Sequence, residues 1–130
     1  MNQPQTAPSA RGILVVDDDA DIRESLGDIL EGEGYLVATA ANGRDGLAYL
    51  RAHPETLLVL LDLMMPIMDG FEFRMEQQRD PEVAAIPVIV MTARGKLEPG
   101  AIDARAIMPK PLKPQRLLEC IREIHDERVR

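Results

Sequence analysis

Short apolar runs alternate with amphipathic segments along most of the chain. The first run is continuous and β-branched, which is typical of a strand buried on both faces of a sheet. In the amphipathic segments, apolar residues recur every three or four positions, as they do on one face of a helix. The pattern predicts strands at residues 13–16, 35–40, 57–61, 88–91 and 106–108.

A helix is predicted after each strand, and Gly or Pro marks several of the boundaries. Gly34 can end the first helix, Pro54 follows the second, and Pro114 is favourable at the first position of the last helix. A shorter helix is expected between the fourth and fifth strands. The other four helices are predicted at residues 21–33, from the turn at 41–43 to about 53, at 71–79 and from about 114 onward.

This alternation of strands and helices determines the predicted fold class. It implies a parallel sheet with right-handed crossovers and helices on both faces. A common order for five such strands is 2-1-3-4-5, and ligands then bind at the carboxyl ends of the strands where the order reverses, between strands 1 and 3. We therefore predict an α/β, flavodoxin-like (βα)5 fold with a doubly wound five-stranded parallel sheet.

Polar residues with complementary chemistry follow four of the predicted strands. Asp17 and Asp18 follow the first, Asp62 the third, Thr92 the fourth and Lys110 the fifth. Adjacent carboxylates repel each other at the edge of a core unless a cation lies among them. Carboxylates, waters and a phosphate are ligands that Mg²⁺ prefers. The spacing predicts a Mg²⁺ site in which Asp62 could attack phosphorus while the hydroxyl and the ammonium stabilise the phosphoryl charge.

Composition and charge narrow the set of functions. The formal net charge of -7 argues against direct binding of nucleic acid or of an anionic membrane surface, and the longest apolar run, 57–61, is too short to span a bilayer. The lone Cys120 excludes an internal disulfide and is compatible with a cytoplasmic location. Residues 1–11 are polar with two prolines and predict a flexible tail before a domain at 12–128.

Four segments resemble the receiver domain of bacterial two-component response regulators. They are "LVVDDD" at 14–19, "LLDLMMPIMDG" at 60–70, "VIVMTA" at 88–93 and "PKPLKP" at 109–114. The second is the most diagnostic, and together the four cover nearly the whole predicted domain. The resemblance implies a phosphorelay signalling protein that catalyses only its own phosphorylation and dephosphorylation, rather than an enzyme with a separate substrate.

The resemblance also implies roles for the acids. Asp62 would receive a phosphoryl group from the phosphohistidine of a sensor histidine kinase or a phosphotransfer protein. Asp17, Asp18, Asp62 and the backbone carbonyl of Met64 would bind Mg²⁺. Phosphorylation would then change the affinity for a downstream protein partner whose identity is unknown.

The remaining implied roles concern the fourth and fifth strands. Thr92 would move toward the phosphate, Lys110 would pair with it, and the Lys110–Pro111 peptide bond would be cis. Ile107 occupies the position where the family usually has a switching aromatic residue. The connection from Thr92 to Lys110 is about one helical turn, roughly four residues, shorter than usual, which predicts a short, distorted or mobile fourth helix at 95–104.

Several alternatives remain open at this point. The segment "ILVVDDDA" also resembles the strand end of haloacid dehalogenase-type phosphatases, with Asp17 as nucleophile and Asp19 as acid–base residue, but that hypothesis gives 60–70 no role. A degenerate receiver that acts as an unphosphorylated interaction module is the third hypothesis. If the chain is complete, it would be a single-domain response regulator, and it could form a homodimer. If the chain is a fragment, an output domain has been removed. Asp19 and Asp69 are each expected to begin a helix rather than bind metal.

Overall fold

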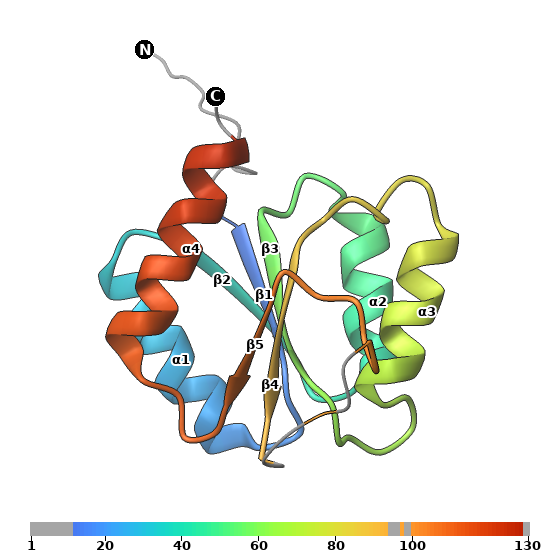
Figure 1. Cartoon of the computed structure of the whole chain (residues 1–130), viewed down its shortest axis with the longest axis horizontal. Helices are drawn as coiled ribbons and strands as arrows, with labels where there is room; N and C mark the ends of the chain where they lie inside the picture. Colours follow the sequence, from blue (N-terminus) through green and yellow to red (C-terminus); the bar gives the residue numbers. More distant parts are fainter. Residues whose placement is uncertain (1–11, 94–96, 98–99, 129–130) are drawn as a thin grey trace.

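Five parallel strands form one sheet at the centre of the molecule (Figure 1). The computed structural model describes residues 12–93, 97 and 100–128; the tail predicted at residues 1–11 lies outside this part of the chain. The strand order is β2-β1-β3-β4-β5, as predicted. The strands are β1 (Gly12–Val16), β2 (Leu36–Ala40), β3 (Leu58–Asp62), β4 (Val88–Thr92) and β5 (Ala106–Pro109).

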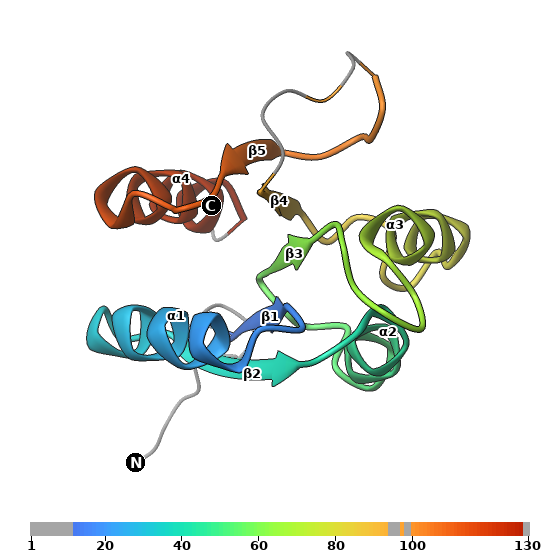
Figure 2. The ribbon, with the colours of Figure 1, turned by 90° about the horizontal axis from the view of Figure 1, so that it is seen from below.

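Two pairs of helices cover the two faces of the sheet, which confirms the doubly wound fold. Helices α1 and α4 lie on one face and α2 and α3 on the other (Figure 2). Among the described residues, no helix has both the length and the apolar content needed to cross a membrane. The helices are α1 (Ala20–Gly32), α2 (Gly43–Ala52), α3 (Gly70–Arg79) and α4 (Pro114–Arg128).

Alternate residues of the central strands supply two separate hydrophobic cores. In β1, Ile13 and Val15 pack toward α1 and α4, whereas Leu14 and Val16 pack toward α2 and α3. All four of these side chains are buried. The continuous apolar runs of the sequence therefore reflect burial on both faces of the sheet, and the polar residues after each run fall at the sheet edge.

Local hydrogen bonds set the helix ends near the carboxyl edge of the sheet. Asp19 is the N-cap of α1 and accepts hydrogen bonds from the main-chain N–H groups of Asp21 and Ile22. Asp69 and Glu72 form a reciprocal capping box at the start of α3. Both aspartates thus have the capping role expected from the sequence, because a side-chain oxygen there satisfies N–H groups that the helix leaves unpaired.

The connection between β4 and β5 differs from the predicted fold. Its described residues, 93, 97 and 100–105, contain no helix, and the rest of the predicted fourth helix lies outside the described residues. Instead, the Arg74 side chain of α3 binds Asp103 in this connection: Nε donates to the main-chain oxygen at 2.7 Å, and Nη2 lies 3.6 Å from Oδ2. Nη1 of Arg74 donates to Oε1 of the buried Gln77. Arg74 therefore binds a non-helical segment to α3, where a short helix was expected.

Replacing Arg74 by Ala should lower the free energy of unfolding by about 2 kcal/mol, because two charge-assisted hydrogen bonds of a largely buried guanidinium are lost. Urea denaturation would measure the loss, and amide exchange at residues 102–105 should become faster. Arg79→Ala is the matched control on the same helix: its side chain is 69% exposed, and its ion pair with Glu76 should contribute less than about 0.5 kcal/mol. Equal losses in the two variants would contradict this role of Arg74.

Candidate functional site

Three carboxylates meet at the carboxyl ends of β1 and β3, where the strand order reverses. Asp17 and Asp18 follow β1, and Asp62 is the last residue of β3. One oxygen from each carboxylate lies within 4.8 Å of the others. Asp17 and Asp62 are buried, whereas Asp18 is exposed. The carboxylates that follow two different strands are therefore close enough to share one small cation.

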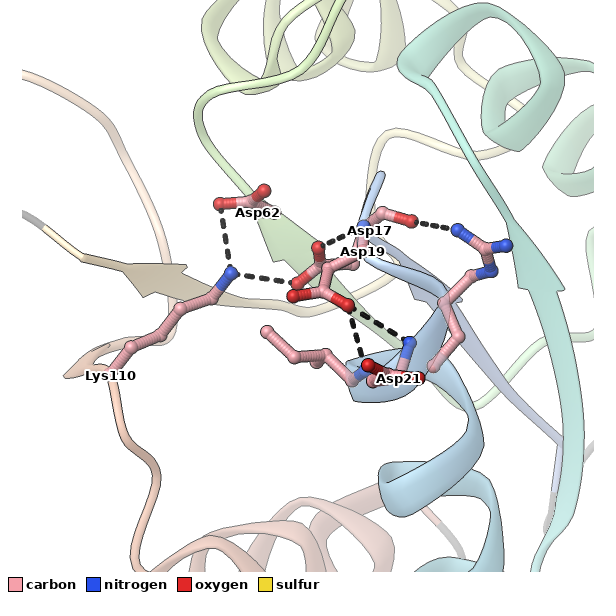
Figure 3. A network of polar contacts seen from close by, with 7 residues as sticks. Asp17, Asp19, Asp21, Asp62 and Lys110 are labelled. Atoms are coloured by element: carbon pink, nitrogen blue, oxygen red, sulfur yellow. Dashed lines mark hydrogen bonds and ion pairs between the residues drawn. The ribbon is translucent and has the colours of Figure 1, made fainter.

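Every polar group of Asp17 has a partner, and the close view shows the partners of its carboxylate and main-chain oxygens (Figure 3). Its N–H donates to the oxygen of Ala40 at 3.1 Å, and its Oδ1 accepts from the N–H of Asp19 at 2.9 Å. Its Oδ2 accepts from Lys110 Nζ at 2.8 Å. Its main-chain oxygen accepts from Nη1 of Arg23 at 2.7 Å. Asp17 is thus held rigidly at the base of the site.

Lys110 lies between two of the carboxylates (Figure 3). Its Nζ is 2.8 Å from Oδ2 of Asp17 and 3.5 Å from Oδ1 of Asp62, so Asp17 is the nearer partner. Burial lowers the pKa of Lys110, but the two carboxylates outweigh burial and hold this pKa above its ordinary value. The ammonium is therefore charged at neutral pH and remains beside Asp62.

The Asp62 carboxylate is poorly stabilised in the absence of a cation. Burial is the main cause that raises its pKa, to about 6, and the neighbouring charge of Asp17 raises it further. Lys110 and a backbone hydrogen bond from Met64 act in the opposite direction. A cation at this site would favour the ionised form, which is the form that can act as a nucleophile.

The other predicted site residues lie at or near the carboxyl ends of the strands, as the acids do. Thr92, which ends β4, is buried, and its main-chain oxygen accepts from the N–H of Lys110 at 2.8 Å. The Lys110–Pro111 peptide bond is cis, which is the isomer that the resemblance implies. Met64 lies two residues after Asp62, and its side chain is exposed. Ile107 lies on β5 and is 45% exposed, so this aliphatic residue is not enclosed in the core.

Two glycines allow the loops around the site to approach each other closely; the sequence pattern placed Gly43 in a predicted turn and Gly70 at the end of the segment 60–70, without this role. A Cβ atom on Gly43 would lie 2.5 Å from the main-chain oxygen of Met68, and one on Gly70 would lie 2.7 Å from that of Asp62. Arg23 was not identified at all, since nothing in the spacing of the motif points to it. The dipeptides "NG" at 42–43 and "DG" at 69–70 were the available signals for the glycines.

Gly70→Ala should destabilise the fold by about 2 kcal/mol, because the added methyl group would overlap the backbone of Asp62 and Leu63. Gly27→Ala in α1 is the matched control: nothing lies within 4 Å of the point that its added methyl group would occupy, and the exchange should add about 0.5–1 kcal/mol of helix stability. Thermal and urea denaturation of both variants would test this difference. A Gly70→Ala variant as stable as the wild type would contradict the close packing beneath Asp62.

Fold and site together define a flavodoxin-like α/β protein with an acidic pocket at the reversal point of its sheet. The family description "Response regulator receiver domain" matches residues 13–122, and the chain belongs to this family. This match argues against the dehalogenase-type hypothesis. In addition, both carboxylate oxygens of Asp17, the nucleophile of that hypothesis, are already hydrogen-bonded, and Asp19 caps a helix.

Individual relatives agree with this family. The transcriptional regulatory protein CpxR homolog of Haemophilus influenzae is 40% identical over 119 residues, which are 86% of this chain and 49% of that protein. Protein PilH of Pseudomonas aeruginosa is 34% identical over 116 residues, covering 86% of this chain and 95% of PilH. This chain thus spans about half the length of the CpxR homolog but nearly all of PilH.

Solved structures show the same fold. The chemotaxis response regulator CheY4 of Vibrio cholerae superposes with a TM-score of 0.80 at 30% sequence identity. The superposition covers 88% of this chain and 98% of the CheY4 chain. The predicted strand order and the predicted family are therefore both confirmed.

Proposed function

We propose that this chain is a phosphoacceptor receiver whose Asp62 takes a phosphoryl group from the phosphohistidine of a sensor histidine kinase or a phosphotransfer protein. One observation carries the proposal: Asp62 is buried at the end of β3 with Asp17 and Asp18 within 4.8 Å and Lys110 at 3.5 Å. A nucleophile, a cation site and a fixed positive charge are the parts that phosphoryl transfer requires. We assign the receiver domain to residues 12–128.

The chemistry of the donor set fits Mg²⁺. Asp17, Asp18 and Asp62 offer hard carboxylate oxygens, and the carbonyl of Met64 would be a further oxygen ligand. Carboxylates this close repel each other, and the charge of Asp17 adds to burial, the main cause, in raising the pKa of Asp62. A bound Mg²⁺ would neutralise part of this charge and part of the charge on the incoming phosphoryl group.

The chain's own residues perform the transfer in this proposal. An oxygen of Asp62 attacks phosphorus, the new P–O bond forms as the P–N bond to the donor imidazole breaks, and the electron pair returns to the imidazole nitrogen. Lys110 shifts from Asp17 toward the new phosphoryl oxygens, and the Thr92 hydroxyl donates a hydrogen bond to one of them. Water later hydrolyses the aspartyl phosphate, so the protein catalyses reactions only at its own Asp62.

Phosphorylation would control the binding of a downstream protein if that protein binds the phosphorylated and unphosphorylated states with different affinities. By linkage, the partner would then favour the phosphorylated or the unphosphorylated state to the same extent. The net charge of -7 makes nucleic acid and an anionic membrane poor direct partners. Ile107 has no polar tip to report its position, so we propose that Thr92 and Lys110 carry the switch. A cytoplasmic location, a homodimer and a single-domain regulator remain parts of this proposal.

Incubation with acetyl phosphate and Mg²⁺, followed by borohydride reduction and peptide mass spectrometry, tests the proposal. Modification is expected at Asp62, and it should disappear in Asp62→Asn and in the presence of EDTA. Modification at Asp17 would instead support the phosphatase chemistry. An unmodified protein that still binds Mg²⁺ would favour the degenerate receiver.

A further inference from the structure

A single arginine side chain from α1 reaches back to the loop that carries the acid pair. Arg23 is half-buried in the second turn of α1, and its Nη1 donates to the main-chain oxygen of Asp17 at 2.7 Å. This distance is at the short end of the range for charge-assisted hydrogen bonds. The contact is made to the backbone, so it fixes the course of the chain rather than neutralising a carboxylate directly.

The oxygen that Arg23 binds belongs to the peptide group between Asp17 and Asp18. Asp17 is otherwise held on the β1 side of that peptide through its N–H and its Oδ2, whereas its Oδ1 accepts from the N–H of Asp19, on the far side of Asp18. Within the described part of the chain, the Asp18 carboxylate makes no hydrogen bond or ion pair. The residues on both sides of Asp18 are thus anchored, and the hydrogen bond from Arg23 fixes the orientation of the peptide plane that leads into Asp18.

We infer that Arg23 is a positioning residue that preorganises Asp18 for a divalent cation. The inference deepens the proposed function and rests on its Mg²⁺ site. Without the Arg23 hydrogen bond, the peptide plane between Asp17 and Asp18 would be less restricted, because the hydrogen bond from Asp19 to Asp17 Oδ1 does not engage its oxygen, and cation binding would have to order it further. A ligand that is ordered in advance binds more tightly, because less conformational entropy is lost on binding.

The charge of Arg23 has the opposite effect on a cation. A guanidinium beside the main chain of the acid pair makes the site less negative and weakens the attraction for Mg²⁺. Removing Arg23 should therefore strengthen binding if the residue acts only through its charge. It should weaken binding if the residue acts by positioning, so the sign of the change separates the two roles.

The test is a titration of the unphosphorylated protein with Mg²⁺. Calorimetry measures the affinity, and the NMR amide signals of Asp18 and Asp19 report binding at the site. Arg23→Met removes the donors and the charge, Arg23→Lys keeps the charge but not the fork of donors, and Arg122→Met removes an equal charge from an exposed site on α4. We expect Arg23→Met to bind about tenfold more weakly, Arg23→Lys to be intermediate, and Arg122→Met to match the wild type.

Unchanged or tighter Mg²⁺ binding by Arg23→Met would overturn the positioning role. If Arg23→Met does not fold, Arg23→Gln carries the test, because it also removes the charge and shortens the side chain, and unchanged or tighter Mg²⁺ binding in that variant would also overturn the role. A wild-type protein that fails to bind Mg²⁺ would overturn the proposed metal site itself. The two failures are therefore distinguishable.

Discussion

Replacing Asp62 by Asn is expected to stabilise the metal-free protein by about 3 kcal/mol at pH 8, although it removes the proposed phosphoacceptor. The folded protein raises the pKa of this carboxyl group from 3.8 to about 6, mainly through burial and then through Asp17. Folding therefore works against the ionised form, and an uncharged amide of similar shape avoids this penalty. Urea denaturation in EDTA would measure the gain.

The raised pKa also fixes the sign of the pH dependence. Asp62 contributes stability when it is protonated, so its contribution is fully present below about pH 4 and is lost as the pH rises through about 6. The gap between Asp62→Asn and the wild type should accordingly be smaller at pH 5 than at pH 8. Adding Mg²⁺ at pH 8 should narrow the gap by stabilising the wild type.

Asp28→Asn provides the matched control, because it removes the same charge from an exposed position on α1. Its effect on the free energy of unfolding should stay below about 0.5 kcal/mol at both pH values. If Asp62→Asn were no more stable than the wild type at pH 8, the carboxylate would not be under the electrostatic strain that the geometry indicates.

The strands and the acidic pocket could be predicted because both depend on short-range pattern plus topology. A run such as 13–16 shows where a buried strand ends, and the residue after it must lie at the sheet edge. Parallel strands place all their carboxyl ends at one edge. Asp17 and Asp62 were therefore expected to be neighbours, and the structure brings them together.

The individual side-chain contacts in the pocket could not be predicted. Lys110 Nζ lies 2.8 Å from Oδ2 of Asp17 but 3.5 Å from Oδ1 of Asp62. This preference depends on side-chain rotamers and on the exact course of two loops. The hydrogen bond from Arg23 to a main-chain oxygen leaves no signature in the sequence, since every residue has that oxygen.

The connection between β4 and β5 illustrates a different limit. Its shortness was visible in the sequence and predicted a short, distorted or mobile helix. In the described residues of this connection, the contact between Arg74 and Asp103 takes the place of helix packing. These two residues are 29 positions apart in the sequence. An arginine on a mostly polar helix looks like a surface residue, so its largely buried position could only come from the structure.

Lys110→Met is expected to destabilise the metal-free protein by about 3 kcal/mol, because it leaves the buried Asp17 carboxylate without its cationic partner. Asp17 is 0% exposed, so water cannot replace the lost ammonium. The same variant should take up phosphate from acetyl phosphate more slowly, since it lacks a charge beside the transferring group. Urea denaturation and a phosphorylation time course would measure the two effects.

The double variant Asp17→Asn/Lys110→Met separates a broken ion pair from a general packing defect. Removing both charges leaves no uncompensated buried group, so the double variant should recover much of the stability lost in Lys110→Met. Lys113→Met, at an exposed position three residues further along the chain, should have little effect. A double variant that is less stable than Lys110→Met alone would show that Lys110 stabilises the fold through some contact other than Asp17, and the fixed charge beside Asp62 would need another explanation.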